Sequence, residues 1–439
     1  MNVDKLQKRK VFPKTADVDD NGILHIGGCD SVELTKEFGT PLYVYDEATL
    51  HGSSKSFIDA FNKNYTKSEV VYASKAFINV PLARLLSAYG LGFDVVSGGE
   101  LAVLKVAEVD PSKVYFHGNN KTPIELEEAI EWGVGHVVVD GIEEIVLLNS
   151  IASQKGIKQK ILLRVSPGVD PHTHHHTTTG TLDSKFGVPI ETGAAEEAVK
   201  AALSSTNLDI QGLHFHLGSP IFELEPYQKA IDVTLRFAAD MQTHGLVLSR
   251  FSPGGGFAIA YTENDNPPTA EDYAFAICSS VSKTCLELNL PEPDLVVEPG
   301  RAISGPAGVA IYTVGVTKEI PGVRTYVSVD GGMGDNIRPA LYDSTYEAIV
   351  ANKALLKPTE TFTIAGKYCE SGDILVRDAQ LPQVSAGDLI AIPASGAYSP
   401  SMASTYNLNG RPAIVLVRDG EATLIRRRET YSDLMAADI

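Results

Sequence analysis

Apolar and β-branched residues are concentrated in eight short runs between residues 69 and 300, and helix-like segments separate most of these runs. In NVPLARLLSAYG (79–90) and GAAEEAVKAALSS (193–205), the apolar residues recur every three or four positions, which is the spacing of an amphipathic helix. Eight strands that alternate with helices over ~235 residues are what a (β/α)8 TIM barrel requires, so the pattern predicts this fold. A doubly wound parallel sheet is the alternative. The eight runs are EVVYASK (69–75), GLGFDVVS (90–97), KVYFHG (113–118), GHVVVD (135–140), KILLRVS (160–166), IQGLHFHLG (210–218), LSRFSPGG (248–255) and PDLVVEPG (293–300).

Polar residues or glycines stand at the C-terminal ends of nearly all these runs. In a (β/α)8 barrel these ends form the rim on which the active site is assembled. Polar residues also begin ordinary loops, but so many charged or glycine-rich strand ends in one chain favour a functional rim. The residues are Lys75, Asp94, Ser97, His117, Arg164, His216, Gly254 to Gly256 and Glu298.

The pattern changes after residue 301, where runs such as TYVSVDGG (325–332) and PAIVLVRDG (412–420) predict strands with few helices between them. The first ~45 residues also contain strand-like runs, so we expect them to join the same β-rich domain. The whole fold is therefore predicted as α/β plus all-β, a barrel with a β-sandwich or β-barrel domain. The predicted domains are an N-terminal segment 1–46, a barrel 47–302 and a C-terminal β domain 303–439.

Composition and charge narrow the class of protein. The 439 residues are 44% hydrophobic and 21% charged, which is the balance of a globular protein, and the length suits two domains. The formal net charge of -18 argues against nucleic acid or membrane surfaces as partners, because these attract clustered Lys and Arg. No apolar run approaches the roughly 18 residues needed to span a bilayer, and the N-terminus lacks the apolar core of a signal peptide. We therefore expect a cytoplasmic protein.

The cysteines and histidines give little reason to expect a metal site. Cys29, Cys278, Cys285 and Cys369 are widely spaced and form no C-x-x-C pair, so neither a disulfide framework nor a structural zinc site is expected. HTHHHTTTG (172–180) contains four histidines and resembles a metal-binding tract. It lacks a carboxylate at ligand spacing, however, and we expect an ordinary loop there and no metal.

Four features at the predicted rim could carry chemistry. Lys75 ends the apolar strand VVYASK, and desolvation there would lower the pKa of its amine and make it a nucleophile toward an aldehyde. The glycines of SPGGGFA (252–258) allow backbone amides to approach a phosphate closely, although a flexible turn is an equal alternative. Glu298 of EPGR could hold a protonated pyridine nitrogen, or pair with Arg301. His214 and His216 alternate along one strand, so only one of them should face the barrel interior, and His216 is the better candidate for stacking on a flat cofactor.

Taken together, these motifs resemble the fold-type III pyridoxal-phosphate (PLP) decarboxylases, with their alanine racemase-like barrel, and within them the diaminopimelate decarboxylases. The resemblance runs from PLYVYDEATL (41–50) to YNLNGRPAIVLV (406–417) in consistent order. Lys367 and Tyr368 depart from the smaller or apolar residues expected before CESGD. The motifs are YASKAF (72–77), FDVVSGGEL (93–101), HGNNKT (117–122), DSKFG (183–187), HLGS (216–219), GGGF (254–257), EPGR (298–301) and CESGD (369–373).

The resemblance implies a role for individual residues. Lys75 is implied as the lysine that binds the PLP aldehyde, His216 as the residue that stacks on the ring, and Glu298 as the partner of the ring nitrogen. Cys369 and Glu370 are implied to reach the site of the other subunit of a homodimer, where Cys369 returns a proton to the substrate. The further cofactor-binding residues implied are Asp94, Ser219, Gly254, Gly255, Gly256 and Tyr398.

The substrate implied is meso-2,6-diaminopimelate, which a carboxy-lyase of this family converts to L-lysine and CO2 in the last step of lysine biosynthesis. Its second carboxylate needs a partner, and arginine pairs with carboxylates bidentately. An ornithine, lysine or arginine decarboxylase is the alternative, and a protein that only binds PLP is a third possibility. The substrate-binding residues implied are Arg301, Arg338, Tyr342, Glu370, Ser371 and Tyr398.

Overall fold

The computed structural model of the chain describes residues 6, 8–170 and 183–439, which form two compact units. The barrel unit comprises Ser54–Ala258 and Pro267–Gly300, and the β-rich unit comprises Met1–Ser53, Ile259–Asn266 and Arg301–Ile439. Each unit is described by itself below. The three domain ranges given by the sequence pattern stay predictions.

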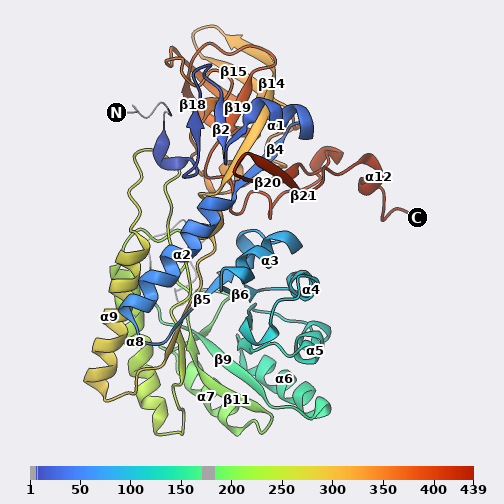
Figure 1. Cartoon of the computed structure of the whole chain (residues 1–439). Coiled ribbons are helices and arrows are strands. Elements are labelled where there is room, and N and C mark those ends of the chain that lie inside the picture. Colours follow the sequence, from blue (N-terminus) through green and yellow to red (C-terminus); the bar gives the residue numbers. More distant parts are fainter. Residues whose placement is uncertain (1–5, 7, 171–182) are drawn as a thin grey trace. The chain divides into compact units, whose positions relative to one another are not determined.

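Eight parallel strands close into a barrel in the barrel unit, which confirms the predicted fold (Figure 1). The barrel closes because β9 pairs with both β8 and β11, while the other strands pair in the order β11, β12, β13, β5, β6, β7, β8. Each of the eight predicted runs overlaps one of these strands, although β5, β9 and β11 begin one or two residues before their runs. The strands are β5 Ser68–Ala73, β6 Gly92–Val95, β7 Val114–Phe116, β8 His136–Val139, β9 Gln159–Ser166, β11 Leu208–His214, β12 Arg250–Ser252 and β13 Asp294–Val297, with a short β10 Val188–Pro189 added beside β9.

The helices between these strands begin and end where local chemistry requires it. In α5, the Thr122 side chain and Glu125 form a capping box, Pro123 occupies the first turn, and Gly133 ends the helix at φ 84°. These are standard start and stop signals. The helices are α2 Glu47–Asn64, which begins in the β-rich unit, α3 Val80–Ala88, α4 Gly98–Val106, α5 Pro123–Trp132, α6 Ile142–Lys155, α7 Ala194–Ser204, α8 Glu225–Gln242 and α9 Ala270–Leu288, with the short helices η2 Ser74–Ala76 and η3 Pro111–Lys113.

The barrel is filled by side chains and is not a pore. A fully buried cluster of Val71, Tyr115, Val138, Leu162 and Val296 occupies its interior. These five residues come from five different strands, as expected for the layered core of this fold. The core therefore separates the C-terminal rim of the barrel from its N-terminal end.

A polar network lies at the N-terminal end of the barrel. Glu69 accepts hydrogen bonds from the Tyr115 hydroxyl at 2.7 Å and from Arg250 Nη1 at 2.8 Å, and Arg250 Nη2 lies 3.7 Å from Asp294. His136 stacks on the Tyr115 ring with centroids 4.7 Å apart. Residues at this end of a (β/α)8 barrel usually contribute to stability, whereas catalytic residues lie at the C-terminal rim.

Replacing Glu69 with glutamine should lower the free energy of unfolding by about 1–3 kcal/mol, because the partly buried Arg250 loses its charged partner and the hydrogen bonds to this position are no longer charge-assisted. Denaturant titration followed by circular dichroism measures the change. The matched control is Glu131→Gln, since Glu131 pairs with Lys155 on the surface and such pairs contribute little. Equal stability of the two variants would contradict the assignment of a structural role to Glu69.

The β-rich unit contains a mixed sheet in which segments distant in sequence are neighbours. Its strands pair in the order β18, β17, β15, β14, β4, β20, β21, and β19 joins β14 to β16. The N-terminal strand β4 lies between β14 and β20, so the N-terminal segment joins the β domain as predicted (Figure 1). The strands of this sheet are β4 Leu42–Asp46, β14 Gly308–Ile320, β15 Arg324–Val329, β16 Ile349–Val350, β17 Glu360–Ala365, β18 Ile374–Leu381, β19 Leu389–Ile392, β20 Ala413–Arg418 and β21 Glu421–Arg426.

The remaining elements of this unit are short. A three-stranded antiparallel sheet of β1, β2 and β3 packs its apolar residues into the same core as β4, β14 and β20. Among the described residues no helix is long and apolar enough to cross a membrane. These elements are η1 Arg9–Val11, β1 Asp17–Val18, β2 Leu24–Ile26, β3 Cys29–Asp30, α1 Ser31–Phe38, α10 Arg301–Ser304, α11 Arg338–Tyr342, η4 Tyr406–Leu408 and α12 Tyr431–Leu434.

Candidate active site

Lys75 lies at the C-terminal rim of the barrel, directly after β5, in the short helix η2. Its Nζ is 3.3 Å from Asp94 Oδ2, and the Asp94 side chain on β6 is fully buried. The Lys75 side chain is 36% exposed, so the expectation of an amine hidden among apolar walls is wrong. Lys75 therefore combines two features: its amine lies beside a buried carboxylate, and it is exposed enough for a small molecule to reach it.

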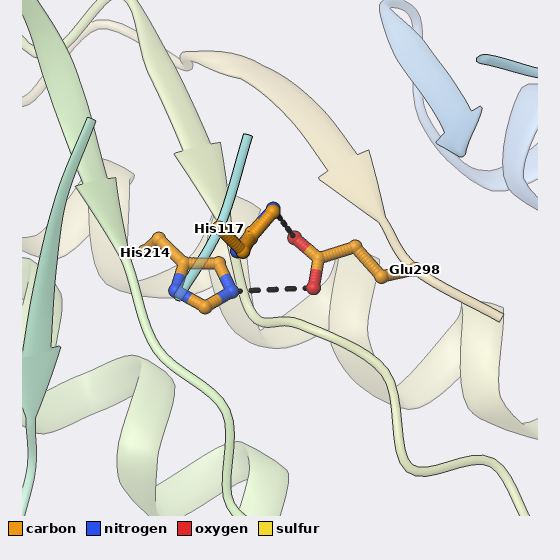
Figure 2. Close-up of side chains that lie close together, drawn as sticks. All are labelled: His117, His214 and Glu298. Carbon is orange, nitrogen blue, oxygen red and sulfur yellow. Dashed lines mark hydrogen bonds and ion pairs between the residues drawn. The ribbon is translucent and has the colours of Figure 1, made fainter. Parts of the chain in front are cut away.

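Glu298 follows β13 and is buried at the rim, where its two carboxylate oxygens face two histidines (Figure 2). His214 Nε2 lies 3.2 Å from Glu298 Oε2, and His117 Nε2 lies 3.6 Å from Oε1. The Ser252 hydroxyl donates to Oε1 at 2.8 Å. Burial alone would raise the pKa of Glu298, but His214, His117 and the Lys75 ammonium outweigh it and hold that pKa well below its usual range. The rim therefore presents an ionised carboxylate in a water-poor site.

His117, His214 and Glu298 also have the atom types of a metal site, and their ligand atoms lie within 4.8 Å of one another. The 3.2 Å separation of His214 and Glu298 is a hydrogen-bond distance, which accounts for the contact without an ion. The sequence-based expectation that the protein holds no metal stays a prediction.

The glycine loop after β12 is held against the strand ends by its own backbone. The Gly254 N–H donates to Ser252 Oγ at 3.1 Å, and the Gly255 N–H donates to His216 Nδ1 at 3.2 Å. A Cβ at Gly255 would lie 2.1 Å from the Glu298 carbonyl oxygen, so only glycine fits there. Two of the three amides expected to hold an anion thus bind protein groups. The Gly256 N–H makes no hydrogen bond within the described part of the chain.

An arginine–tyrosine cluster lies in the β-rich unit and consists of Arg301, Arg338, Tyr261, Tyr346 and Tyr398. Arg301 donates to the Tyr261 hydroxyl and lies 4.7 Å above the Tyr398 ring. Arg338, at the start of α11, donates to the Tyr346 hydroxyl and lies 4.7 Å above the Tyr261 ring. Burial raises the pKa of Tyr261, but the two guanidinium groups outweigh it and hold that pKa below its usual value. The cluster is therefore a strongly positive, buried environment.

Arg338 lacks an anionic partner within the described residues, where its contacts are Tyr261 and Tyr346. The residue is only 4% exposed. A buried cation without a counter-ion is costly, so this geometry is suited to an incoming carboxylate.

CESGD (369–373) lies in the turn between β17 and β18, which pair with each other in the β-rich unit. Cys369, Glu370 and Ser371 are exposed, whereas Asp373 is buried and accepts hydrogen bonds from the Met333 N–H at 2.6 Å and the Tyr368 N–H at 2.8 Å. The turn is thus fixed at its base and presents its first three side chains outward.

Comparison with known proteins decides the family. Residues 53–305 match the family described as "Pyridoxal-dependent decarboxylase, pyridoxal binding domain". The diaminopimelate decarboxylase of Synechocystis sp. is 44% identical and is matched over 98% of this chain and 93% of its own length. The chain belongs to the diaminopimelate decarboxylase family. The enzyme of Bacillus subtilis is also 44% identical, over 95% of this chain and 96% of its own. The crystal structure of the M. jannaschii enzyme in complex with L-lysine is similar, with a TM-score of 0.91 and 37% identity over 97% of this chain and 98% of that chain.

The rim residues fit the pyridoxal phosphate that this family uses. Glu298 is a buried anion whose carboxylate oxygens keep lone pairs beyond those used by Ser252 and His214, so it can pair with a ring nitrogen. Asp94 Oδ1 and His117 Nε2 are buried polar atoms with no hydrogen-bond partner among the described residues. The free Gly256 N–H is a donor of the kind that a phosphate requires.

The other residues inferred from the sequence are distributed over both units. Ser219 lies in the segment after β11, whose Ile221 N–H donates to the Gly256 carbonyl at 2.8 Å, so it lies near the glycine loop. Tyr342 is the last residue of α11. Tyr368, one of the two departures from the family pattern, packs inside the unit and stacks on Tyr406 at 6.1 Å. The tract HTHHHTTTG (172–180) lies outside the described residues.

Sequence reasoning missed two side chains of these clusters, Tyr261 and Tyr346, and misjudged one strand. Because β11 ends at His214, strict alternation does not extend to His216, and both rings contact rim groups. His117 was identifiable as a strand end, but nothing in the sequence connected it with Glu298. Tyr261 and Tyr346 stand outside every motif, and no pattern could have found them.

Proposed function

We propose that this chain is a PLP-dependent carboxy-lyase that converts meso-2,6-diaminopimelate to L-lysine and CO2, the last step of lysine biosynthesis by this route. The observation that carries the proposal is the buried Arg338, which has no anionic partner of its own in the described residues. A substrate with a second carboxylate supplies that partner. Ornithine and lysine end in an amine, which a positive cluster repels.

The barrel rim is the proposed cofactor site. When bound, PLP supplies an aldehyde that captures an amine and a ring that accepts the electron pair left by departing CO2. Lys75 would hold the aldehyde, with its Nζ oriented by Asp94. Glu298 would keep a proton on the ring nitrogen, and His216 would lie against the ring. Ser219, Gly254 to Gly256 and Tyr398 would bind the phosphate, with the Gly256 N–H as the uncommitted amide.

The arginine–tyrosine cluster is the proposed subsite for the far end of the substrate. Arg338 and Arg301 would pair with the distal carboxylate, since their planar groups are already fixed by stacking on tyrosine rings. Tyr342 would contact the same end.

We further propose a homodimer in which each chain contributes the CESGD turn to its partner's site. The exposure of Cys369, Glu370 and Ser371 supports this role, because these side chains are free of their own chain's core and can reach into the active site of a second chain. Cys369 Sγ would return a proton to the carbon that loses CO2, and Glu370 with Ser371 would bind the distal ammonium. A cytoplasmic location remains the prediction made from the composition.

A panel of amino acids tests the proposed substrate. Purified, PLP-loaded protein should release CO2 from meso-diaminopimelate with a kcat/KM at least about 10-fold to 100-fold above that for ornithine, lysine or arginine, because each charged hydrogen bond contributes about 1.5–3 kcal/mol. Product analysis should identify L-lysine. Preferential turnover of ornithine, lysine or arginine would establish the alternative instead.

Replacing Arg338 with alanine should raise the KM for diaminopimelate roughly 10-fold to 100-fold and change kcat less, because binding of the remote carboxylate is lost. Steady-state kinetics measure both constants. The control is Arg324→Ala, because Arg324 also lies over a tyrosine ring in this unit, at 5.9 Å from Tyr326, and has no proposed contact with substrate. An unchanged KM in Arg338→Ala would remove this residue from the subsite.

A further inference from the structure

His117 is a buried side chain at the barrel rim to which neither the mechanism above nor the family motifs assign a task. It follows β7 and is 4% exposed. Its Nε2 lies 3.8 Å from Asp94 Oδ1 and 3.6 Å from Glu298 Oε1. One nitrogen atom therefore faces two carboxylates, Asp94 beside Lys75 and Glu298, the latter shown with His117 in Figure 2.

The two carboxylates determine which nitrogen of the neutral His117 ring carries the hydrogen. A lone pair on Nε2 would be repelled by both anions, so the hydrogen of the neutral ring belongs on Nε2. Burial lowers the pKa of His117 to about 3, although Asp94 and Glu298 act in the opposite direction. The distances from Nε2 to Asp94 and Glu298 both exceed that of a normal hydrogen bond. A small rotation of the ring would therefore be needed for Nε2–H to donate to either carboxylate.

The groups that face His117 come from four parts of the barrel. They are Asp94 of β6, Glu298 after β13, His214 of β11, whose ring centroid is 4.8 Å away, and the Lys75 ammonium. Asp94 Oδ1, like His117 Nε2, has no hydrogen-bond partner among the described residues. Without the His117 donor, Asp94 Oδ1 would be a buried carboxylate oxygen that faces no N–H group of this ring, and an unsatisfied buried acceptor is costly.

We propose that His117 is a positioning residue that shares its Nε2–H donor between Asp94 and Glu298 and so holds both carboxylates in place, Asp94 beside Lys75 and Glu298 as an anion toward the cofactor ring. The inference rests on the proposed function of Lys75 and Glu298. It assigns His117 no contact with substrate. Its effect is on how tightly the protein holds PLP and on the pH at which that binding is lost.

Titration of the apoprotein with PLP from acidic to neutral pH tests this inference, with the affinity and the absorbance spectrum of the bound cofactor as readouts. Replacing His117 with phenylalanine keeps the ring shape but removes the donor. We expect affinity to fall about 10-fold and its acid limit to move up by about one pH unit, since one unit corresponds to a factor of ten. His117→Gln restores an N–H near the Nε2 position. Its affinity for PLP should stay within about 3-fold of that of the parent protein, which is clearly less than the ten-fold loss expected for the phenylalanine variant.

Two further variants make the outcome decisive. The side chain of His117→Asn is shorter, so its N–H lies near the Nδ1 position and does not reach the carboxylates. This variant should resemble His117→Phe, and the comparison of the Gln and Asn variants therefore tests the inference even if His117→Phe does not fold. His136→Phe is the matched control, because His136 is equally buried in the barrel, its pKa is also lowered to about 3 by burial, and it lies at the opposite end. It should bind PLP as the parent does.

The inference is overturned if His117→Phe binds PLP with the parent affinity and pH dependence, or if the Gln and Asn variants are impaired equally. It is also overturned if His136→Phe weakens PLP as much as His117→Phe. The proposed function fails separately, if the parent protein releases no CO2 from diaminopimelate, and that result leaves the PLP titrations interpretable.

Discussion

Lys75→Ala should reduce CO2 release from diaminopimelate by about 10³-fold or more, because the protein loses its aldehyde-binding amine and a proton-transferring group, each of which contributes on the order of 10²-fold to 10⁴-fold. The absorbance of protein-bound PLP should disappear from the spectrum of the dialysed protein together with the activity. Steady-state assays and the spectrum of the same sample measure both losses.

The matched control for this variant is Lys67→Ala. Lys67 immediately precedes the strand whose other end leads to Lys75, and its side chain is 73% exposed. Its ion pair with Asp294 is a surface contact, so the control should keep both the activity and the bound PLP. Retained activity in Lys75→Ala, with PLP still bound after dialysis, would exclude Lys75 as the aldehyde-binding residue.

Glu298→Gln should lower kcat for decarboxylation by about 10²-fold to 10³-fold and leave the KM for diaminopimelate within a few-fold, because an amide cannot hold a proton on the ring nitrogen as a carboxylate does. The ratio of kcat to KM and each constant alone are measured by steady-state kinetics. Glu69→Gln is the control, since Glu69 is a carboxylate at the opposite end of the barrel and its loss should lower stability without lowering kcat.

The pH dependence of the parent protein follows from the same carboxylate. Since the pKa of Glu298 is depressed below its ordinary value of 4.5, the group is ionised throughout the neutral range. Its contribution to stability is present above that ordinary value and is lost as pH falls through the depressed pKa. Titration of Glu298 should therefore not limit activity near neutrality. A kcat/KM profile whose neutral acid limb disappears in Glu298→Gln would contradict this.

The barrel and the identity of the rim residues were predictable because both depend on short-range patterns. Eight β-branched runs specify eight strands, and a polar residue at each strand end must then lie on one rim. Lys75, Asp94 and Glu298 were found in this way. Their relation across the rim was not predictable, because it depends on which strands become neighbours in the closed sheet.

The arginine–tyrosine cluster could be predicted only in part from the sequence. Arg338 was found through a motif, but Tyr261 and Tyr346, which orient it, are 77 residues before and eight residues after it in the chain. They meet only because the segment Ile259–Asn266 folds with the β-rich unit. The exposure of Lys75 was also misjudged, since an apolar strand does not reveal how open its C-terminal end is.

Reduction of the PLP-loaded protein with borohydride, followed by mass mapping of the labelled peptide, identifies the lysine that binds the PLP aldehyde. The predicted result is a single phosphopyridoxyl group on Lys75, in the peptide that contains YASKAF. Lys121 is the instructive comparison, because it is a deeply buried lysine whose ammonium is held by Gly118, Val138 and Glu144 and it should remain unlabelled. A label on Lys121 or any other lysine, with Lys75 unmodified, would show that Lys75 does not bind the cofactor aldehyde.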